Sequence, residues 1–415
     1  MPERNSKSIK HFIAYVEQIE ELNNETKNII LDALTMDMYN RLDPENLSNI
    51  NTEIPTYFFN IVLSNEQLRI SEINFEINSW VQFSASEEQS EFRAQVYNDI
   101  VFEDNFNLLY IKDIKPFSLE GKQKKIFSME IFDEAEKNDL FDFINDIEAN
   151  MVIAYNVGQG NCNGICDETG MPLIYFDFGG GVFQNTKTYP GNYENPIAIN
   201  FCFTTSPLVI LSHWDWDHMA SATKIKHAAI KECIWIAPKQ EIGITHFKFA
   251  MELNKKGNLF IWPNHLLTLR TRNFHIQKLH TSDPKDKNNN GLSMIVRTRS
   301  IYNEYFVLLP GDANYSLLDL KEYEYLHGLV ATHHGASSHN CLDTIPKASL
   351  LHTIAYSYGK NNTHKHPKRL SILEHKKSGW RNKKSTQNGH IALGTDHIIK
   401  TIPCGGHHCS LLPKQ

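Results

Sequence analysis

The pattern of apolar and polar positions changes near residue 150. Before that point, apolar side chains recur at helical spacing over residues 9–22 and again over 29–38, so both segments are predicted to be amphipathic helices. Residues 57–63 have the pattern of a buried strand, and residues 73–77 alternate as in a half-buried strand. Residues 1–148 are therefore expected to form a small α+β accessory domain.

After residue 148, short apolar runs recur, and each ends in polar or glycine-rich residues. The runs that we interpret as buried strands include residues 152–157, 173–176, 208–211, 234–236, 259–262, 305–309, 329–331 and 354–357. Layered α/β folds commonly assemble their active sites from the carboxyl ends of strands. Residues 149–415 are therefore expected to form a second domain, which carries the chemistry.

One strand end has the strongest chemical signal. The apolar run 208–211 is followed by two histidines and two carboxylates, namely His213, Asp215, Asp217 and His218. Residues two apart in an extended or tightly turning loop project to the same side, so the first three can converge on one point and His218 can face a second. Imidazole nitrogen and carboxylate oxygen are the ligands that zinc, manganese or iron take when no thiolate is offered. A solvated polar loop is the alternative, but unpaired carboxylates beside two tryptophans make a poor one.

Charge and histidine content support two units. The 415 residues have a net charge of −7. Residues 1–150 hold 29 acidic against 13 basic residues, which leaves 19 acidic against 28 basic ones in the remainder, and nineteen of the twenty histidines follow residue 200. The basic second part suits a polyanionic partner such as nucleic acid. The acidity of the first part is that of an ordinary solvated face or of a dock for a protein partner.

Membrane and disulfide-rich classes are disfavoured. No apolar run approaches the roughly 20 residues of a membrane helix, and the N-terminus lacks the apolar core of a signal peptide, so a soluble, cytoplasmic protein is expected. The seven cysteines are scattered, which favours reduced thiols. The tail from Cys404 to Cys409 encloses two histidines and offers a further zinc site, although its spacing fits no common structural site.

Glycine-rich turns follow two of the early strands. Residues 158–160 and 179–181 match neither a dinucleotide nor a nucleoside-triphosphate fingerprint, so no organic cofactor is predicted. They indicate tight turns or a close approach of backbone. Asp177, just before the second turn, is expected either to fix a neighbouring side chain or to cap its own backbone.

Several motifs together resemble a known family. In chain order they are Val157-Gly158-Gln159-Gly160, Asp177-Phe178-Gly179, the His213–His218 stretch, Gly311-Asp312, His333-His334-Gly335-Ala336-Ser337, and Asn361 with His366-Pro367. With these motifs, residues 151–400 resemble the metallo-β-lactamase fold, and in particular the hydrolase domain of the competence protein ComEC and its soluble relatives. The resemblance implies an αββα sandwich of two mixed β-sheets flanked by helices, with metals at one edge. The membrane channel of ComEC is absent, so DNA uptake is not implied.

The resemblance also implies a ligand set for two divalent ions. His213 and Asp215 would bind one metal, Asp217 and His218 the second, and Asp312 both, while His333 is favoured over its neighbour to complete a shell. The wider family has histidine where Asp215 stands, and the added carboxylate favours Mn²⁺ beside or instead of Zn²⁺, with Mg²⁺ as a further candidate. The third histidine of many relatives is not identified. His280 lies in the right interval, but a surface residue is its commoner interpretation.

Substrate-side roles follow from the same resemblance. His366 would contact a phosphate or protonate a leaving group, and Asp217 would orient the attacking water as well as bind metal. His334, Lys360 and Asn361 are assigned to substrate binding. Two metals about 3.5–4 Å apart can activate a water and stabilise the departing oxygen without a serine or cysteine nucleophile.

The expected activity is that of a phosphodiesterase or nuclease acting on nucleic acid. Residues 360–384 contain nine Lys or Arg against the single acid Glu374, with Trp380 among them, a composition that can neutralise phosphates and stack a base. The alternatives are a small-molecule hydrolase, acting on a cyclic nucleotide, lactone or β-lactam, and a non-catalytic binding module. A soluble relative of this kind would suit bacterial antiviral defence, an expectation that rests on the resemblance alone.

Overall fold

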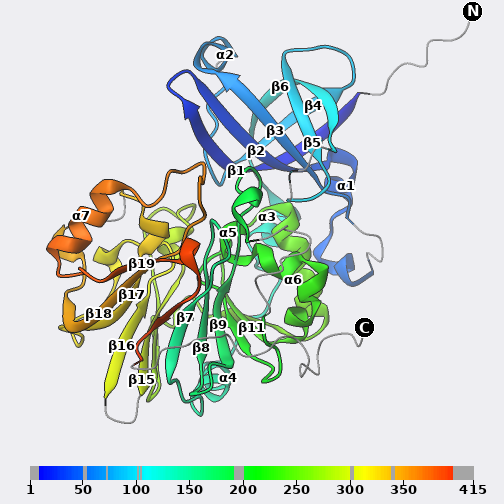
Figure 1. Cartoon of the computed structure of the whole chain (residues 1–415). Helices are drawn as coiled ribbons and strands as arrows, with labels where there is room; N and C mark the ends of the chain where they lie inside the picture. Colours follow the sequence, from blue (N-terminus) through cyan, green and yellow to red (C-terminus); the bar gives the residue numbers. More distant parts are fainter. Residues whose placement is uncertain are drawn as a thin grey trace, which may run out of the picture. The chain divides into compact units, whose positions relative to one another are not determined.

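The computed structural model describes residues 9–49, 54–71, 73–100, 102, 105–190, 201–299, 303–337 and 342–395 (Figure 1). The tail 404–409 therefore lies outside the described residues. Within the described ranges, no helix combines the length and the apolar character needed to cross a membrane. Four of the seven cysteines lie in these ranges as free, buried thiols.

The chain divides into two compact units. The first contains Met1–Phe132 and Glu241–Met251, and the second contains Asp133–Gln240 and Glu252–Gln415. The division falls before residue 148 because helix α4 (Lys137–Ile144) belongs to the second unit, where its Leu140 and Ile144 join the main core.

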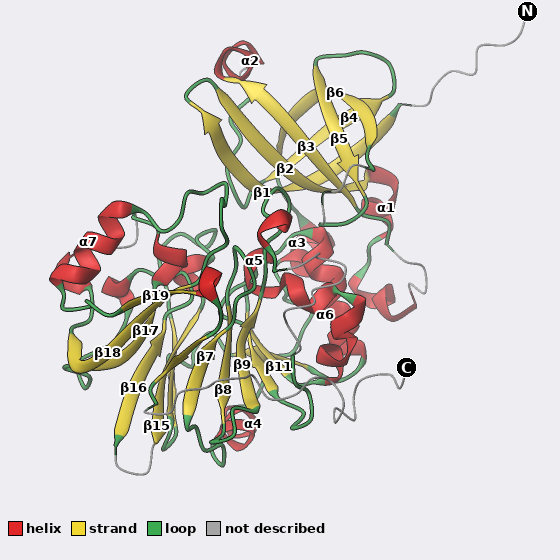
Figure 2. Ribbon diagram, viewed as in Figure 1, coloured by secondary structure: helices red, strands yellow, loops and turns green. Residues whose placement is uncertain are grey.

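The first unit is built around a closed antiparallel barrel with strand order β1-β2-β3-β5-β6-β4 (Figure 2). Its strands are β1 (Lys10–Asn23), β2 (Thr26–Thr35), β3 (Tyr57–Ser64), β4 (Trp80–Ser86), β5 (Phe92–Tyr97) and β6 (Asn107–Phe117). Alternate residues fill the interior, for example Ala14 and Val16 on β1 with Ile29 and Leu31 on β2. Short helices accompany the barrel: α1 (Met36–Arg41), α2 (Asn65–Ser71), α3 (Gly121–Phe127) and most of α6 (Ile244–Lys255).

The helices predicted at residues 9–22 and 29–38 were wrong. Residues 10–22 lie in β1 and residues 29–35 in β2, which pair with each other along most of their length, and only residues 36–38 are helical, as the start of α1. Five consecutive residues of β1 and seven of β2 are buried, because both faces of this part of the barrel wall are covered. Apolar residues on both faces of a strand break the alternation that identifies strands and mimic helical spacing. Residues 73–77 form a loop, not a strand, so the unit is a barrel with short helices instead of the expected α+β domain.

The second unit contains two mixed sheets of seven strands each. One has the order β12-β11-β10-β9-β8-β7-β20, with bounds β7 (Met151–Ala154), β8 (Cys162–Cys166), β9 (Pro172–Phe178), β10 (Leu208–Ile210), β11 (Trp235–Pro238), β12 (Leu259–Trp262) and β20 (Ile391–Leu393). The other runs in order from β13 to β19, with bounds β13 (Thr268–Arg270), β14 (Phe274–Lys278), β15 (Leu292–Arg299), β16 (Glu304–Leu309), β17 (Leu326–Val330), β18 (Ala348–Tyr356) and β19 (Lys383–Ser385). Two mixed sheets were expected from the resemblance, and the strands predicted at the apolar runs are present.

The main core of the second unit contains residues of both sheets. Ile174 and Ile210 of the first sheet join Met294 and Leu309 of the second in one buried cluster. The second sheet also contributes to another core, where Leu308 and Ile354 pack with residues near helix α7 (Arg369–Lys377). Short apolar strands in this unit therefore reflect burial on both faces.

Parallel pairing brings the polar strand ends together. In the first sheet β9, β10, β11 and β12 are parallel, and in the second β16, β17, β18 and β19 are parallel. Carboxyl ends of parallel strands lie at the same edge of a sheet. The amide of Leu292 in the second sheet donates to the carbonyl of Ser212 at 2.7 Å, which ties this edge to the loop after β10.

Truncation of Leu309 tests the importance of the core shared by the two sheets. Its side chain is fully buried in that core, whereas Leu350 on β18 is fully exposed. We expect Leu309→Ala to lower the free energy of unfolding of the second unit by about 2–5 kcal/mol. Leu350→Ala is the control and should change it by less than about 0.5 kcal/mol. Equal effects in denaturant titrations would contradict this assignment of the core.

Candidate metal centre

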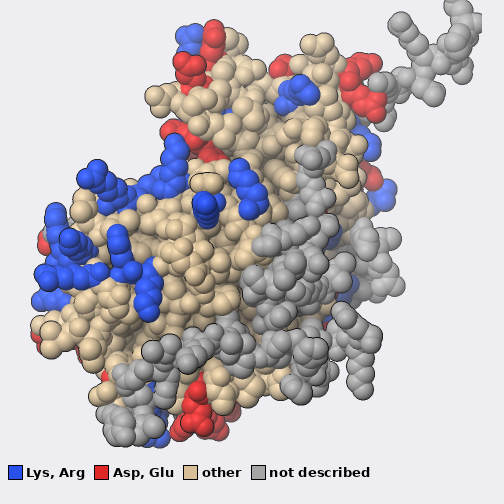
Figure 3. Space-filling model, in the orientation of Figure 1, with Lys and Arg blue, Asp and Glu red and all other residues tan. Residues whose placement is uncertain are grey.

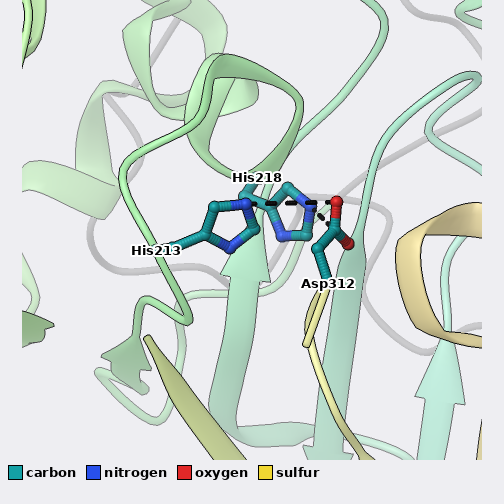
Figure 4. A group of neighbouring side chains, drawn as sticks. All are labelled: His213, His218 and Asp312. Carbon is teal, nitrogen blue, oxygen red and sulfur yellow. Dashed lines mark ion pairs between the residues drawn. The ribbon is translucent and has the colours of Figure 1, made fainter. Parts of the chain in front are cut away.

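Three side chains from both sheets meet at the shared edge. His213 and His218 come from the loop and short helix α5 (Trp216–Met219) after β10, and Asp312 follows β16 (Figure 4). Nε2 of His218 lies 3.1 Å from Oδ1 of Asp312, and Nε2 of His213 lies 4.0 Å from Oδ2 of the same carboxylate. All three side chains are at least 97% buried. The loop pattern predicted His213, Asp215 and Asp217 around one point and His218 at a second, and the resemblance added Asp312; this buried group contains His213, His218 and Asp312.

The buried atoms of this group fit a metal ion. Nε2 of His213, Nε2 of His218 and Oδ1 of Asp312 are all buried and make no hydrogen bond, although the last two face each other as an ion pair at 3.1 Å. A buried polar atom left without a partner costs about 1–3 kcal/mol. Imidazole nitrogen and carboxylate oxygen are ordinary ligands of divalent transition metals, so bound metal ions would satisfy all three atoms.

A second group lies beside the first and shares His218. Asp217, His218 and His334 offer ligand atoms within 4.8 Å of one another. Nε2 of His334 is 3.0 Å from Oδ2 of Asp217, and its Nδ1 donates to the carbonyl of Ser357 at 2.8 Å. Burial alone lowers the pKa of His334, but Asp312 and Asp217 raise it above the usual value. These carboxylates therefore favour positive charge in this group, and a bound metal ion would supply that charge.

The two neighbouring histidines, His333 and His334, lie in different surroundings. His334, assigned from the sequence to substrate binding, is 1% exposed and lies in the buried group with Asp217. His333, assigned as a ligand, is 30% exposed, and its Nε2 lies 3.7 Å from Oδ2 of Asp312. Both residues and Gly335 have positive φ angles, a sparsely populated conformation for histidine that turns the two rings apart.

Asp177 holds the loop that carries the histidines. Its Oδ1 accepts from the amide of Ser212 at 2.7 Å, and its Oδ2 accepts from the Ser212 hydroxyl at 3.0 Å. Oδ2 also lies 2.8 Å from Nδ1 of His218, which leaves Nε2 of that ring directed at Asp312. Of the two roles considered for Asp177, these contacts match the fixing of a neighbouring side chain.

Asp215 is paired with a buried lysine that the sequence analysis missed. Oδ1 of Asp215 lies 2.9 Å from Nζ of Lys287, which also donates to the Trp214 carbonyl at 3.0 Å. Oδ2 of Asp215 lies 3.4 Å from Nε2 of His213. Burial alone raises the pKa of Asp215, but Lys287 and His213 outweigh it and hold the pKa well below the usual value.

No local pattern marks Lys287, because its partners lie in a different loop. Gln240 joins the two loops: its side chain accepts from the amide of Trp214 at 3.0 Å and donates to the Lys287 carbonyl at 2.8 Å. His280, the histidine considered for a third ligand, is exposed and belongs to neither group of side chains.

The glycine-rich turns support the backbone of the loop. The carbonyl of Asp217 accepts from the amides of Asn161 at 2.8 Å and Gly180 at 3.2 Å. A Cβ atom at Gly179 would stand 1.7 Å from that carbonyl oxygen, and one at Gly160 would stand 2.6 Å from it. The prediction of a close backbone approach is confirmed, and both positions require glycine for it.

His366 lies beside the two histidines of the β17 loop. Its ring centroid is 5.7 Å from that of His333 and 6.2 Å from that of His334. Burial, helped by these neighbours, lowers its pKa to about 2, so the ring is neutral near pH 7. Asn362 holds its backbone: Oδ1 accepts from the His366 amide and Nδ2 donates to the His366 carbonyl, both at 2.9 Å.

The other predicted substrate residues are Lys360 and Asn361. Both are exposed residues of the turn before His366, and Asn361 has a φ of 56°. Asn362, the residue that positions His366, was not singled out from the sequence. The sequence shows two adjacent asparagines in this turn, but it does not show which of them faces inward.

Comparisons with known proteins found similarity to solved structures of metallo-β-lactamase-fold proteins. No protein-family model and no curated protein matches it. Similar solved structures include the metallo-β-lactamase fold protein YhfI from Bacillus subtilis, with 14% identity and a TM-score of 0.32 over 57% of this chain and 95% of that one. The FEZ-1 metallo-β-lactamase from Legionella gormanii has 8% identity and a TM-score of 0.21 over 40% and 66%. A B3 metallo-β-lactamase with an active-site glutamic acid has 11% and 0.22 over 45% and 71%.

Removal of the Asp177 carboxylate tests its positioning role. Asp177→Asn removes the charged acceptor from Nδ1 of His218 while every candidate ligand stays in place. We expect the affinity for Zn²⁺, measured by competition with a chromogenic chelator, to fall about 10–100-fold.

Asp167→Asn is the matched control. The Asp167 carboxylate accepts hydrogen bonds from the amides of Thr169 and Met171 in its own turn. These bonds do not involve any candidate ligand. This variant should leave the zinc affinity unchanged. An Asp177→Asn variant that binds zinc as tightly as the wild type would rule out the positioning role.

Proposed function

We propose that the second unit is a metal-dependent hydrolase of the metallo-β-lactamase fold and that it cleaves phosphodiester bonds in nucleic acid. The observation that carries the hydrolase proposal is the pair of adjacent ligand groups that share His218 at the common edge of the two sheets. Three ligand atoms there are buried without hydrogen bonds. Two neighbouring sites for ions are the arrangement that phosphodiester hydrolysis uses.

The ligand assignment follows the direction of each atom. Asp312 is assigned to both ions, because its Oδ1 faces His218 and its Oδ2 faces His213. The first ion is then held by His213 with Asp215 in reach, and the second by Asp217, His218 and His334. The set contains nitrogen and oxygen and no sulfur, which suits Zn²⁺ or Mn²⁺, and with its carboxylates also Mg²⁺.

The surrounding residues have separate tasks. Bound divalent ions supply Lewis-acid stabilisation of negative charge and lower the pKa of an attacking water. Asp177 fixes the orientation of the His218 ring, and Lys287 offsets the negative charge of Asp215. Because the imidazole of His366 is neutral near pH 7, it would make a hydrogen bond to a substrate oxygen and not an ion pair with it.

A basic surface supports nucleic acid as the substrate. Lys and Arg side chains gather over the region of α7 (Figure 3). Eight of the nine basic residues of segment 360–384 are exposed, and only Lys368 is half-buried. This segment contains His366, and two of its lysines, Lys383 and Lys384, line one cavity with the neighbouring Pro367. Phosphates held by these lysines would therefore lie near His366.

The expected stacking role of Trp380 was wrong. Its side chain is 2% exposed, and its indole donates to the carbonyl of Pro346 at 2.7 Å, so it belongs to the core and cannot stack on a base. A cavity of about 430 Å³ offers another place where a base could bind. It is lined by Tyr358, Pro367, Lys383 and Lys384 among others, and Pro367 follows His366 directly. A tyrosine beside two lysines suits a nucleotide.

The most informative experiment combines metal analysis with cleavage assays. Single-stranded DNA, duplex DNA and RNA are incubated with the protein in Mn²⁺, Mg²⁺ and Zn²⁺. Asp217→Ala is assayed in parallel. We expect metal-dependent cleavage by the wild type and a loss of more than about 100-fold in the variant, because even residues that only support a ligand are worth about 10–100-fold.

The result also separates the alternatives. Turnover of small esters, lactones or cyclic nucleotides without cleavage of nucleic acid would replace the nuclease proposal by a small-molecule hydrolase. Identical products from wild type and Asp217→Ala would mean that the cleavage comes from a contaminant. Measured absence of bound metal in the wild type would favour a binding module.

Charge removal on α7 tests the binding surface. The double variant Lys376→Ala/Lys377→Ala removes two exposed charges from α7. We expect affinity for nucleic acid to fall similarly for all sequences, and the slope of log affinity against log salt to decrease by about 1–2, because each contacted phosphate contributes about 0.7–0.9. Lys124→Ala/Lys125→Ala on α3 of the first unit is the matched control and should bind as the wild type does. An unchanged salt slope for the α7 variant would exclude this surface.

A further inference from the structure

The first unit buries a second cluster of metal-ligating side chains. Glu17 of β1, Asp32 of β2 and His246 of α6 offer ligand atoms within 4.8 Å of one another. The Glu17 side chain is 3% exposed, and Asp32 and His246 are fully buried. Nδ1 of His246 lies 3.3 Å from Oε1 of Glu17. None of the three residues belongs to the metal centre of the second unit.

The strand register explains how the two carboxylates meet. Tyr15 pairs with Asp32 and Val16 with Leu31, after which the register shifts, so Glu17 is the extra residue of a β-bulge. Val16 and Leu31 point into the barrel, so Asp32 points to the outer face of the wall. A bulge re-aims a side chain, and here it brings Glu17 toward the same outer position as Asp32.

The beginning of α6 completes the cluster. Oδ2 of Asp32 accepts from the amide of Thr245 at 2.6 Å, and Oδ1 accepts from the Thr245 hydroxyl at 2.9 Å. These bonds join residues 213 positions apart in the sequence. His246, the next residue, is thereby held against the two carboxylates.

This environment favours a bound cation. Oε1 of Glu17 is buried and makes no hydrogen bond. A Cβ atom at Gly243 would stand 2.2 Å from that oxygen and 3.1 Å from Oδ2 of Asp32, so both carboxylates pack against the backbone of Gly243 and leave no room for a side chain there.

We propose that Glu17, Asp32 and His246 form a structural divalent-cation site in the first unit. One nitrogen and two carboxylate ligands suit Zn²⁺ or Mn²⁺ better than Ca²⁺, which takes six to eight oxygens. The ion joins two barrel strands to a helix from a distant part of the chain, and its role is to stabilise that junction. This site is independent of the function proposed for the second unit.

The direct test is crystallographic. Crystals of the full-length protein grown with Zn²⁺ are measured above and below the zinc absorption edge. We expect an anomalous difference peak within about 2.0–2.2 Å of the ligand atoms of Glu17, Asp32 and His246. No peak there, in crystals whose second-unit centre shows one, would overturn the proposal and leave a hydrogen-bonded cluster of carboxyls and imidazole.

Matched variants test the site in solution. Glu17→Gln/Asp32→Asn should hold one metal equivalent less than the wild type after gel filtration in Zn²⁺, measured by mass spectrometry of the metal. Gly243→Ala keeps all three ligands and should also lose that equivalent, because its Cβ would displace the Glu17 carboxylate oxygen from its place in the cluster. The exposed Glu21→Gln on the same strand is the control and should keep the wild-type content. Wild-type metal content in both site variants would overturn the proposal.

A stability measurement accompanies the metal count. Zn²⁺ at 100 times its dissociation constant should raise the melting temperature of the first unit by about 5–10 °C in the wild type. Glu17→Gln/Asp32→Asn should lack this increase while its hydrolytic activity remains that of the wild type. The same increase in the variant would contradict a stabilising ion at this place, whatever the outcome of the cleavage assays.

Discussion

The geometry of the candidate metal centre depends on the carboxylate of Asp177. Fully buried at the end of β9, it accepts hydrogen bonds from the amide and hydroxyl of Ser212 and contacts the ring of His218. A buried charge is stable only when its oxygens are satisfied, so these contacts hold the loop after β10 in one conformation. The second nitrogen of His218 is thereby directed at Asp312, which comes from the other sheet.

The two sheets supply different halves of this centre. The loop after β10 contributes the histidines and carboxylates between His213 and His218, whereas Asp312 and His334 follow strands β16 and β17. Parallel pairing within each sheet places these strand ends at one edge, and the common core keeps the two edges together. Positioning on strand ends rather than on long free loops holds these atoms within a few ångströms of one another.

Local patterns identified many strands of the second unit, but in the first unit they identified β3 and mistook β1 and most of β2 for helices. The apolar runs of the second unit predicted strands in both sheets, because fully buried strands are short and uniformly apolar, but β8, β13 and β14 were not among them. In the barrel, burial on both faces of β1 and β2 produced a spacing that imitates a helix. Trp380 misled for a related reason: basic neighbours suggested a surface residue, but the indole packs inward and bonds to Pro346.

The sequence by itself determined which types of ligand the loop after β10 can offer. Two histidines and two carboxylates within six residues after a buried strand limit the ligands to nitrogen and oxygen, whatever surrounds them. Tertiary structure decided the partners: that His334 rather than His333 joins Asp217, that Lys287 faces Asp215, and that Asn362 holds His366. It alone also brings Glu17 and Asp32 to His246. These contacts join residues distant in the chain, and no local periodicity records them.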